Sequence, residues 1–244
     1  MYQLLILAQL TSAGEFNQDS QLNTWCRMQL ANLLRSMGYI VSKELVYQQN
    51  YIPMTRDELV GQLKKALKDK RFRHVLRVEQ TAIDLARKNN VDIEKASIAG
   101  LCHDYAKQRP DSDFIAEIKK KGLDPLLLDY GNAIWHGVVG AELIKDELGI
   151  WDEDILNAVR HHTTGAPVMT KLEQVIYMAD YIEPGRDFAG VNKARIITAA
   201  NLQAGVAYQT KHTLAYLIAN DKPVYPKTID TYNAWVPQYE GEID

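Results

Sequence analysis

Apolar residues recur at helical spacing through almost the whole chain that follows Thr55. In FRHVLRVEQTAIDLA they stand three or four positions apart, and IEKASIAGLCHDYA repeats the pattern. Neither stretch alternates between apolar and polar residues as a half-buried strand would. The pattern predicts an all-α fold, and 244 residues with 46% hydrophobic content are enough for one main domain plus an appendage.

Capping signals place several helix boundaries. Thr55 and Thr170 are each followed three residues later by Glu, which predicts a capping box at the start of two helices. We also expect one long helix from about 192 to 220, followed by the tail PVYPKTIDTYNAW. Helix ends are predicted at Gly122, at Gly149, at Gly165-Ala166-Pro167 and at Pro184-Gly185.

Residues 1–53 differ from the rest of the chain in composition. They contain a short apolar run, a polar stretch, one amphipathic segment and a connector rich in Tyr and Gln. No chemistry can be assigned to them. We therefore divide the chain into an N-terminal extension of unknown role, residues 1–53, and a helical domain with a C-terminal tail, residues 54–244.

The charge balance limits the kinds of ligand that this chain is expected to bind. The net charge is −3, so there is no basic excess of the kind that attracts nucleic acid or an anionic membrane. A small anionic ligand held by a few placed cations fits better. Two cysteines are too few for a disulfide framework, which favours the cytoplasm. The run MYQLLILAQL lacks a basic n-region and is shorter than a membrane span, so neither secretion nor membrane insertion is expected.

Histidines stand in predicted helices or at helix ends, beside acidic or small residues. Imidazole and carboxylate together suit a divalent transition metal ion. In a helical bundle such side chains converge only if each lies near a helix end or on an inward face. The groups concerned are His74, the pair His103-Asp104, His136 and the pair His161-His162.

Small side chains accompany the second of these groups. Ala96, Ala99, Gly100 and His103 share one helical face. A neighbouring helix could approach this face closely, at the place where His103 points inward.

Asp180 stands between apolar neighbours in VIYMADYI, on a helix face that should be buried. Burying an unpaired carboxylate is costly or shifts its pKa, so a metal ion, an arginine such as Arg186 or a helix cap should accompany it. Each group alone has an ordinary explanation, such as a solvated basic face around His74. The order His, His-Asp, His, His-His, Asp across a single domain nevertheless favours a metal site.

That order resembles the HD superfamily of metal-dependent phosphohydrolases, in which a first histidine, an adjacent His-Asp pair and a late aspartate bind the ion. The matching residues here are His74, His103, Asp104 and Asp180. The blocks RFRHVLRVEQTAIDLA, AGLCHDYAK, AIWHGVVGAELI, AVRHHTTG, YMADYIEPGRDFAGV and PKTIDTYN together look like the YqeK family of bacterial HD proteins. The resemblance covers about Thr55 to Trp235 and implies an HD-domain helical bundle with a short N-terminal extension.

The resemblance also implies an activity, a metal and a set of contacts. The activity is symmetrical hydrolysis of diadenosine tetraphosphate to two ADP, with iron as the ion and manganese or another divalent ion as alternatives. The implied substrate contacts surround the metal ligands and extend into the tail: Arg71, Arg73, His74, Asp104, Tyr105, Ala106, Lys107, His136, His162, Thr163, Asp180, Arg186, Pro223, Val224, Tyr225, Pro226, Lys227 and Thr228.

The chemistry of such a centre can also be reasoned without the family. An ion held by three or four protein groups lowers the pKa of a bound water and polarises a phosphoryl oxygen. We expect in-line attack of that water on phosphorus, with Asp104 as ligand and proton acceptor. Lys107, His136 and Arg186 would neutralise charge on the polyphosphate. His136 and His162 either contact substrate phosphate, which we favour, or complete a second metal site about 3.5–4 Å from the first.

Two other functions fit the same residues. One is an HD nucleotidase that removes phosphate from a deoxynucleotide or from a guanosine alarmone. The other is a regulator that binds a nucleotide without turnover and uses residues 1–53 to engage a partner protein. The complete ligand set argues against a regulator, because a sensor has no need of an open metal position. The expected partner is a small-molecule nucleotide, and the aromatic content and apolar tail are compatible with a homodimer.

Overall fold

The computed structural model describes residues 45–239, and within that range it contains helices and no β-strand. This confirms the predicted all-α class. In chain order the helices are α3 (Arg56–Ala66), α4 (Asp69–Asn89), α5 (Ile93–Cys102), α6 (Asp111–Lys121), the 3-10 helix η1 (Pro125–Asp129), α7 (Asn132–Leu148), α8 (Glu153–His161), α9 (Lys171–Ile182), α10 (Val191–Ala200), α11 (Leu202–Ala219) and α12 (Pro226–Trp235).

The capping signals in the sequence act as expected. At Thr55 and at Thr170 the side chain accepts a hydrogen bond from the backbone N–H three residues later, and the glutamate there accepts one in return. Gly122 and Gly149 end α6 and α7 with φ values of 60° and 67°. Glycine takes this left-handed conformation without the steric cost that a Cβ imposes. The predicted boundaries at these four positions are therefore confirmed.

The prediction of one long helix from about 192 to 220 is wrong. Asn201 leaves the helical conformation, with φ −153° and ψ 121°, and separates α10 from α11. Its side chain accepts a hydrogen bond from the backbone N–H of Ala204, so it caps α11. The break folds α10 against α11 so tightly that Gly205 has no room for a Cβ beside Thr198.

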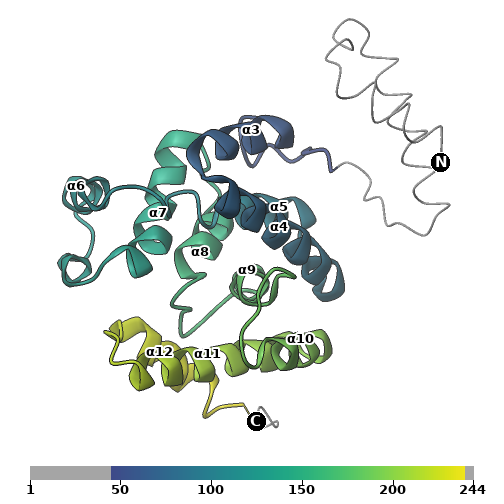
Figure 1. Ribbon diagram of the computed structural model, residues 1–244. Helices are drawn as coiled ribbons and strands as arrows, with labels where there is room; N and C mark the ends of the chain where they lie inside the picture. The colour runs from purple at the N-terminus through teal and green to yellow at the C-terminus, as the bar shows by residue number, and fades with distance from the viewer. Residues whose placement is uncertain (1–44, 240–244) are drawn as a thin grey trace, which may run out of the picture. The chain divides into compact units, whose positions relative to one another are not determined.

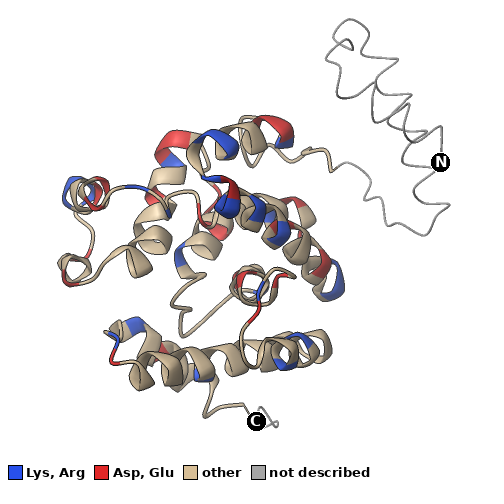
Figure 2. Ribbon diagram, viewed as in Figure 1, with Lys and Arg blue, Asp and Glu red and all other residues tan. Residues whose placement is uncertain are grey.

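The C-terminal tail also contains a helix that the sequence pattern did not predict. Pro226 occupies the first turn of α12, where its missing N–H has no partner to lose. α12 packs on α11, and both helices carry few charged residues (Figure 2).

The described helices enclose two apolar cores. The larger lies mainly between α4, α5, α8 and α9, while α10 and α11 cover the other side of α9 (Figure 1). The smaller core lies between α6, η1 and α7. Cys102 and Tyr105 belong to the larger core and Ala106 to the smaller one. His103 and Asp104 therefore lie where the two cores meet.

The last residues of the predicted extension contact the helical domain. The backbone N–H groups of Gln48 and Gln49 donate to the Glu94 carboxylate at 2.8 and 3.1 Å, and Tyr47 Oη lies 2.9 Å from Ser97 Oγ. The compact body accordingly begins at Val46. The amphipathic segment and Cys26 lie outside the described residues. Cys102 is buried and free, and no helix within residues 45–239 is long and apolar enough to cross a membrane.

Candidate metal centre

The four predicted ligands come from three helices. His74 lies on α4, His103 and Asp104 follow the last turn of α5, and Asp180 lies near the end of α9. His74, His103 and Asp104 are buried, and Asp180 is partly exposed. As the small side chains predicted, α4 and α5 approach closely: a Cβ on Gly100 would meet a backbone Cα of α4 at 3.0 Å. This approach brings the His103 side chain next to His74.

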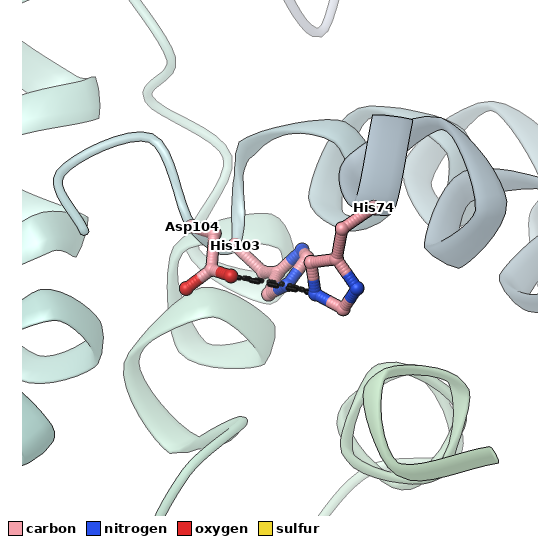
Figure 3. Close-up of side chains that lie close together, drawn as sticks. All are labelled: His74, His103 and Asp104. Carbon is pink, nitrogen blue, oxygen red and sulfur yellow. Dashed lines mark hydrogen bonds and ion pairs between the residues drawn. The ribbon is translucent and has the colours of Figure 1, made fainter. Parts of the chain in front are cut away.

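The donor atoms of these residues converge on one small volume. His74 Nε2 lies 3.3 Å from His103 Nε2, 3.4 Å from Asp104 Oδ2 and 3.1 Å from Asp180 Oδ1. His103 Nε2 lies 3.3 Å from Asp104 Oδ2 and 3.8 Å from Asp180 Oδ1. Figure 3 shows the imidazoles of His74 and His103 and the carboxylate of Asp104 directed toward one another.

This geometry fits one divalent ion. Two atoms that each lie about 2.1 Å from a shared ion are at most about 4.2 Å apart, and all the separations above are shorter. Two imidazoles and two carboxylates also form the mixed nitrogen and oxygen donor set that transition ions accept. The residues therefore fit the metal that the sequence pattern predicts.

The second nitrogen of each imidazole has a partner, which leaves Nε2 free to bind. His103 Nδ1 donates to the Gly100 carbonyl at 2.7 Å. His74 Nδ1 faces the buried carboxylate of Glu183 at 3.1 Å, and Arg77 donates to the same carboxylate. Neither Glu183 nor Arg77 was singled out in the sequence, because their contact with His74 depends on how α4 packs against the end of α9.

The electrostatics of the centre are those of two histidines and two carboxylates that stabilise each other's charged forms. Burial lowers the pKa of His74, but hydrogen bonds with Asp104 and Asp180 outweigh it and raise that pKa to about 9. Burial raises the pKa of both carboxyls, and the nearby histidines more than offset this, so each pKa falls below its usual range. The two carboxylates are therefore ionised and ready to bind a cation at neutral pH.

A second group of donors adjoins the first. Asp104 Oδ1 lies 3.5 Å from His136 Nε2, which is 3.0 Å from His162 Nε2. Nδ1 of each of these histidines donates to a backbone carbonyl, so each Nε2 carries a lone pair. Thr163 Oγ1 lies 3.1 Å from both Nε2 atoms, and Lys107 Nζ lies 3.2 Å from His136 Nε2. Asp104, His136 and His162 are spaced so that they too could hold an ion.

Burial keeps this second group of histidines neutral. It lowers the pKa of His136 well below the usual value, and together with the charge of His103 it lowers the pKa of His162 to about 4. Lys107 is partly buried, and burial lowers its pKa.

Two of the predicted arginines contact ligand carboxylates, and one does not. Arg71 Nη1 donates to Asp104 Oδ2 at 2.5 Å. Arg186 donates to the Asp180 carboxylate and, at 2.8 Å, to its backbone carbonyl. Arg73 is exposed on α4, the adjacent position to buried His74, and therefore faces another direction.

The remaining residues that the resemblance assigns to substrate differ in their exposure. Tyr105 donates its hydroxyl to Glu147, and Ala106 packs in the smaller core, so both side chains are engaged in the fold. His161 points away from the second group, because its Nδ1 bonds Glu173 at the start of α9. In the tail, Tyr225 and Thr228 are buried, Val224 is partly buried, and Pro223, Pro226 and Lys227 are exposed.

Comparison with known proteins identifies the same region of the chain. The family model described as HD domain matches residues 71–185. The symmetrical bis(5'-nucleosyl)-tetraphosphatase of Bacillus subtilis (strain 168) is 43% identical over 180 residues, which are 74% of this chain and 97% of that protein. The protein of the same name from Staphylococcus aureus is 41% identical over 172 residues, covering 70% of this chain and 89% of the relative.

A solved structure agrees with the fold. The crystal structure of a predicted HD superfamily hydrolase involved in NAD metabolism from Clostridium acetobutylicum matches with a TM-score of 0.72 and 37% identity. The match covers 76% of this chain and 99% of the other. The matched family model and these identities show that this chain belongs to the HD-domain family that includes the symmetrical bis(5'-nucleosyl)-tetraphosphatases.

Proposed function

We propose that this protein is a metal-dependent phosphohydrolase that cleaves diadenosine tetraphosphate symmetrically into two ADP. The observation that carries the proposal is the convergence of His74, His103, Asp104 and Asp180 within ligand distance of one another. The substrate comes from the relatives, two of which bear the name of this activity and are 41–43% identical over most of their length.

The residues around the centre have separate tasks in this reaction. A divalent ion, when bound, lowers the pKa of water and polarises a phosphoryl oxygen. Asp104 belongs to both donor groups and is the proposed proton acceptor. Lys107, Arg71 and Arg186 supply positive charge beside them, which stabilises the polyphosphate and the charge that develops on it. Because the net charge of the chain is −3, these few cations, and not a basic surface, would attract the polyphosphate.

The native ion and the roles of His136 and His162 form the finer part of the proposal. Iron is the proposed ion, and manganese is the first alternative. The sequence alone favours a contact of both histidines with substrate phosphate. Their lone pairs and their spacing with Asp104 support the other role, as ligands of a second ion. Metal content per chain separates the roles: two retained ions, with loss of one in His136→Ala, would exclude the phosphate contact.

Product analysis tests the activity directly. The purified protein is incubated with diadenosine tetraphosphate and Fe²⁺ or Mn²⁺, and the nucleotides are separated by chromatography. Two ADP per substrate are expected. AMP with ATP would indicate attack at another phosphorus, and an intact dinucleotide with orthophosphate released from nucleoside monophosphates would support the rival nucleotidase.

The regulator hypothesis is tested with Asp104→Ala. An enzyme loses turnover in this variant because a ligand and proton acceptor is removed, whereas a sensor loses at most nucleotide binding. Binding of ADP by calorimetry and turnover by chromatography are measured on the same preparation.

Homodimer formation and a cytoplasmic location stay predictions. Sedimentation of the purified protein would test whether it forms a homodimer.

A further inference from the structure

Glu183 is a buried carboxylate that the proposed reaction does not use. It follows α9 directly, three residues after Asp180, and only 1% of its surface is exposed. Four N–H groups surround its two oxygens. His74 Nδ1 and Arg77 Nη2 lie 3.1 and 3.0 Å from Oε1, and Arg77 Nε and the Gly185 backbone each lie 2.5 Å from Oε2.

The contact with His74 decides which imidazole nitrogen faces the metal centre. A carboxylate accepts hydrogen bonds, so Nδ1 donates to Glu183 and Nε2 is the nitrogen that faces the ion site. That Nε2 is the atom located 3.1 Å from Asp180 and 3.3 Å from His103. Glu183 thus orients the His74 ring from the side opposite the ion.

Glu183 is itself held in place from several directions. Arg77 and His74 are three residues apart on α4 and therefore share one face, which the carboxylate bridges. A Cβ on Gly185 would lie 2.5 Å from Arg77 Nε, so a larger residue at this position would displace the guanidinium that binds Glu183. Arg195 Nη2 donates to the backbone carbonyls of Glu183 and Arg186, both at 2.9 Å. None of these contacts requires the ion.

We propose that Glu183 is a positioning residue of the metal centre, which fixes the tautomer and orientation of His74 while Arg77 holds its carboxylate in place. This inference rests on the metal site of the proposed function but not on its substrate. Carboxylates that orient a metal-bound histidine typically contribute about 10–100-fold to metal affinity. The glutamine variant should lose much of that contribution, because an amide N–H₂ would face the N–H groups of Arg77 or Gly185.

Glu79 provides a matched control within the same domain. It is also buried, and Arg56 donates to both of its oxygens, at 2.7 and 2.6 Å. Its remaining partner, however, is Ser97 rather than a metal ligand. Replacing Glu79 removes a comparable buried ion pair without touching His74.

The test measures Co²⁺ binding to metal-stripped, full-length protein, without substrate. Dissociation constants and Co²⁺ absorption spectra are compared for wild type, Glu183→Gln and Glu79→Gln. Both variants should lower the melting temperature of the metal-free protein, but only Glu183→Gln should weaken Co²⁺ binding, about 10–100-fold, and alter the spectrum. Equal Co²⁺ affinity and spectra in Glu183→Gln and wild type would overturn the proposal, as would equal losses in the two variants.

Arg77→Met keeps the test decisive if Glu183→Gln does not fold. Arg77 is more exposed than Glu183, so its replacement should be tolerated, and the freed carboxylate should orient His74 less strictly. A several-fold weaker Co²⁺ affinity is expected. Unchanged affinity in this variant would contradict the proposal. Because no nucleotide is present, a failure of these experiments is distinct from a failure to hydrolyse diadenosine tetraphosphate.

Discussion

At the scale of single residues, the centre shows how strongly neighbouring side chains on one helix can differ in role. Arg71 and Arg73 lie near the start of α4, just before His74, and the family resemblance implies that both contact the substrate. In the structure Arg71 reaches the Asp104 carboxylate, while Arg73 is exposed. Of these two arginines, we therefore propose that Arg71 acts on a phosphate bound at the centre.

Replacing these two arginines should therefore have unequal effects. Arg71→Gln should lower kcat/KM for diadenosine tetraphosphate about 10–100-fold, because a charged hydrogen bond contributes about 1.5–3 kcal/mol. Arg73→Gln should remain within about twofold of wild type, since a solvated charge contributes little. Initial rates over a range of substrate concentrations measure both. Equal losses in the two variants would show that Arg73 also reaches the substrate.

The convergence of His74, His103, Asp104 and Asp180 could be predicted from the sequence, because the order of these residues along the chain carries the information. Glu183 could not be predicted, although it lies within the block that contains Asp180. Its partner His74 is 109 residues away, and a buried glutamate at a helix end has many ordinary explanations. The pairing becomes visible only when the packing of α4 against α9 is known.

At the scale of elements, the sequence predicts a helix end where a local signal determines it. It does not predict a helix end that depends on tertiary packing. Thr55, Thr170, Gly122 and Gly149 each satisfy backbone groups within a few residues, so their effect is visible in the sequence. The break at Asn201 has a capping residue too, but the apolar spacing continues across it. Tertiary contact between α10 and α11 decides in favour of two helices.

The close approach of α4 and α5 predicts opposite effects for two glycine substitutions. Gly100→Ala should destabilise the protein by about 1–3 kcal/mol, because the new Cβ meets backbone atoms that cannot move aside. Gly61→Ala should stabilise it by about 0.5–1 kcal/mol, since this exposed position in α3 has no atom within 4 Å of the new Cβ. Urea unfolding gives both values. A stabilised Gly100→Ala protein would show that the two helices can separate.

The capping interactions at the start of α9 should stabilise the protein less at acid pH. The Glu173 carboxylate accepts hydrogen bonds from Thr170 and His161, and although burial raises its pKa, these bonds lower it below the usual 4.5. A lowered folded-state pKa means that the stability contribution is complete above about pH 4.5 and is lost as the pH falls below it.

Glu173→Gln keeps the capping geometry and removes the charge. At pH 6 it should be less stable than wild type by about 1–3 kcal/mol, and this difference should shrink as the pH falls below about 4.5. Thermal unfolding at several pH values measures the difference. A stability difference between Glu173→Gln and wild type that grows as the pH falls would contradict the lowered pKa of Glu173.

At the scale of the whole molecule, the candidate metal centre lies where several helices meet. Its proposed ligands come from α4, from the end of α5 and from α9, and the Asp104 carboxylate also faces His136 on α7. Without an ion, two ionised carboxylates and several imidazoles face one another at short range. Metal binding and the stability of the described domain should therefore be coupled.

Removal of the ion should lower the melting temperature of the protein. An ion that binds only the folded state adds about 2.7 kcal/mol at a concentration 100 times its dissociation constant. For a domain of this size that corresponds to a shift of about 5–10 °C. Calorimetry before and after chelation, and after Mn²⁺ is restored, measures the shift. Asp180→Ala lacks one ligand and should show a smaller shift under the same conditions, because its site binds Mn²⁺ more weakly. A melting temperature that is unchanged by chelation in the wild-type protein would mean that the four converging groups hold no ion in the folded state.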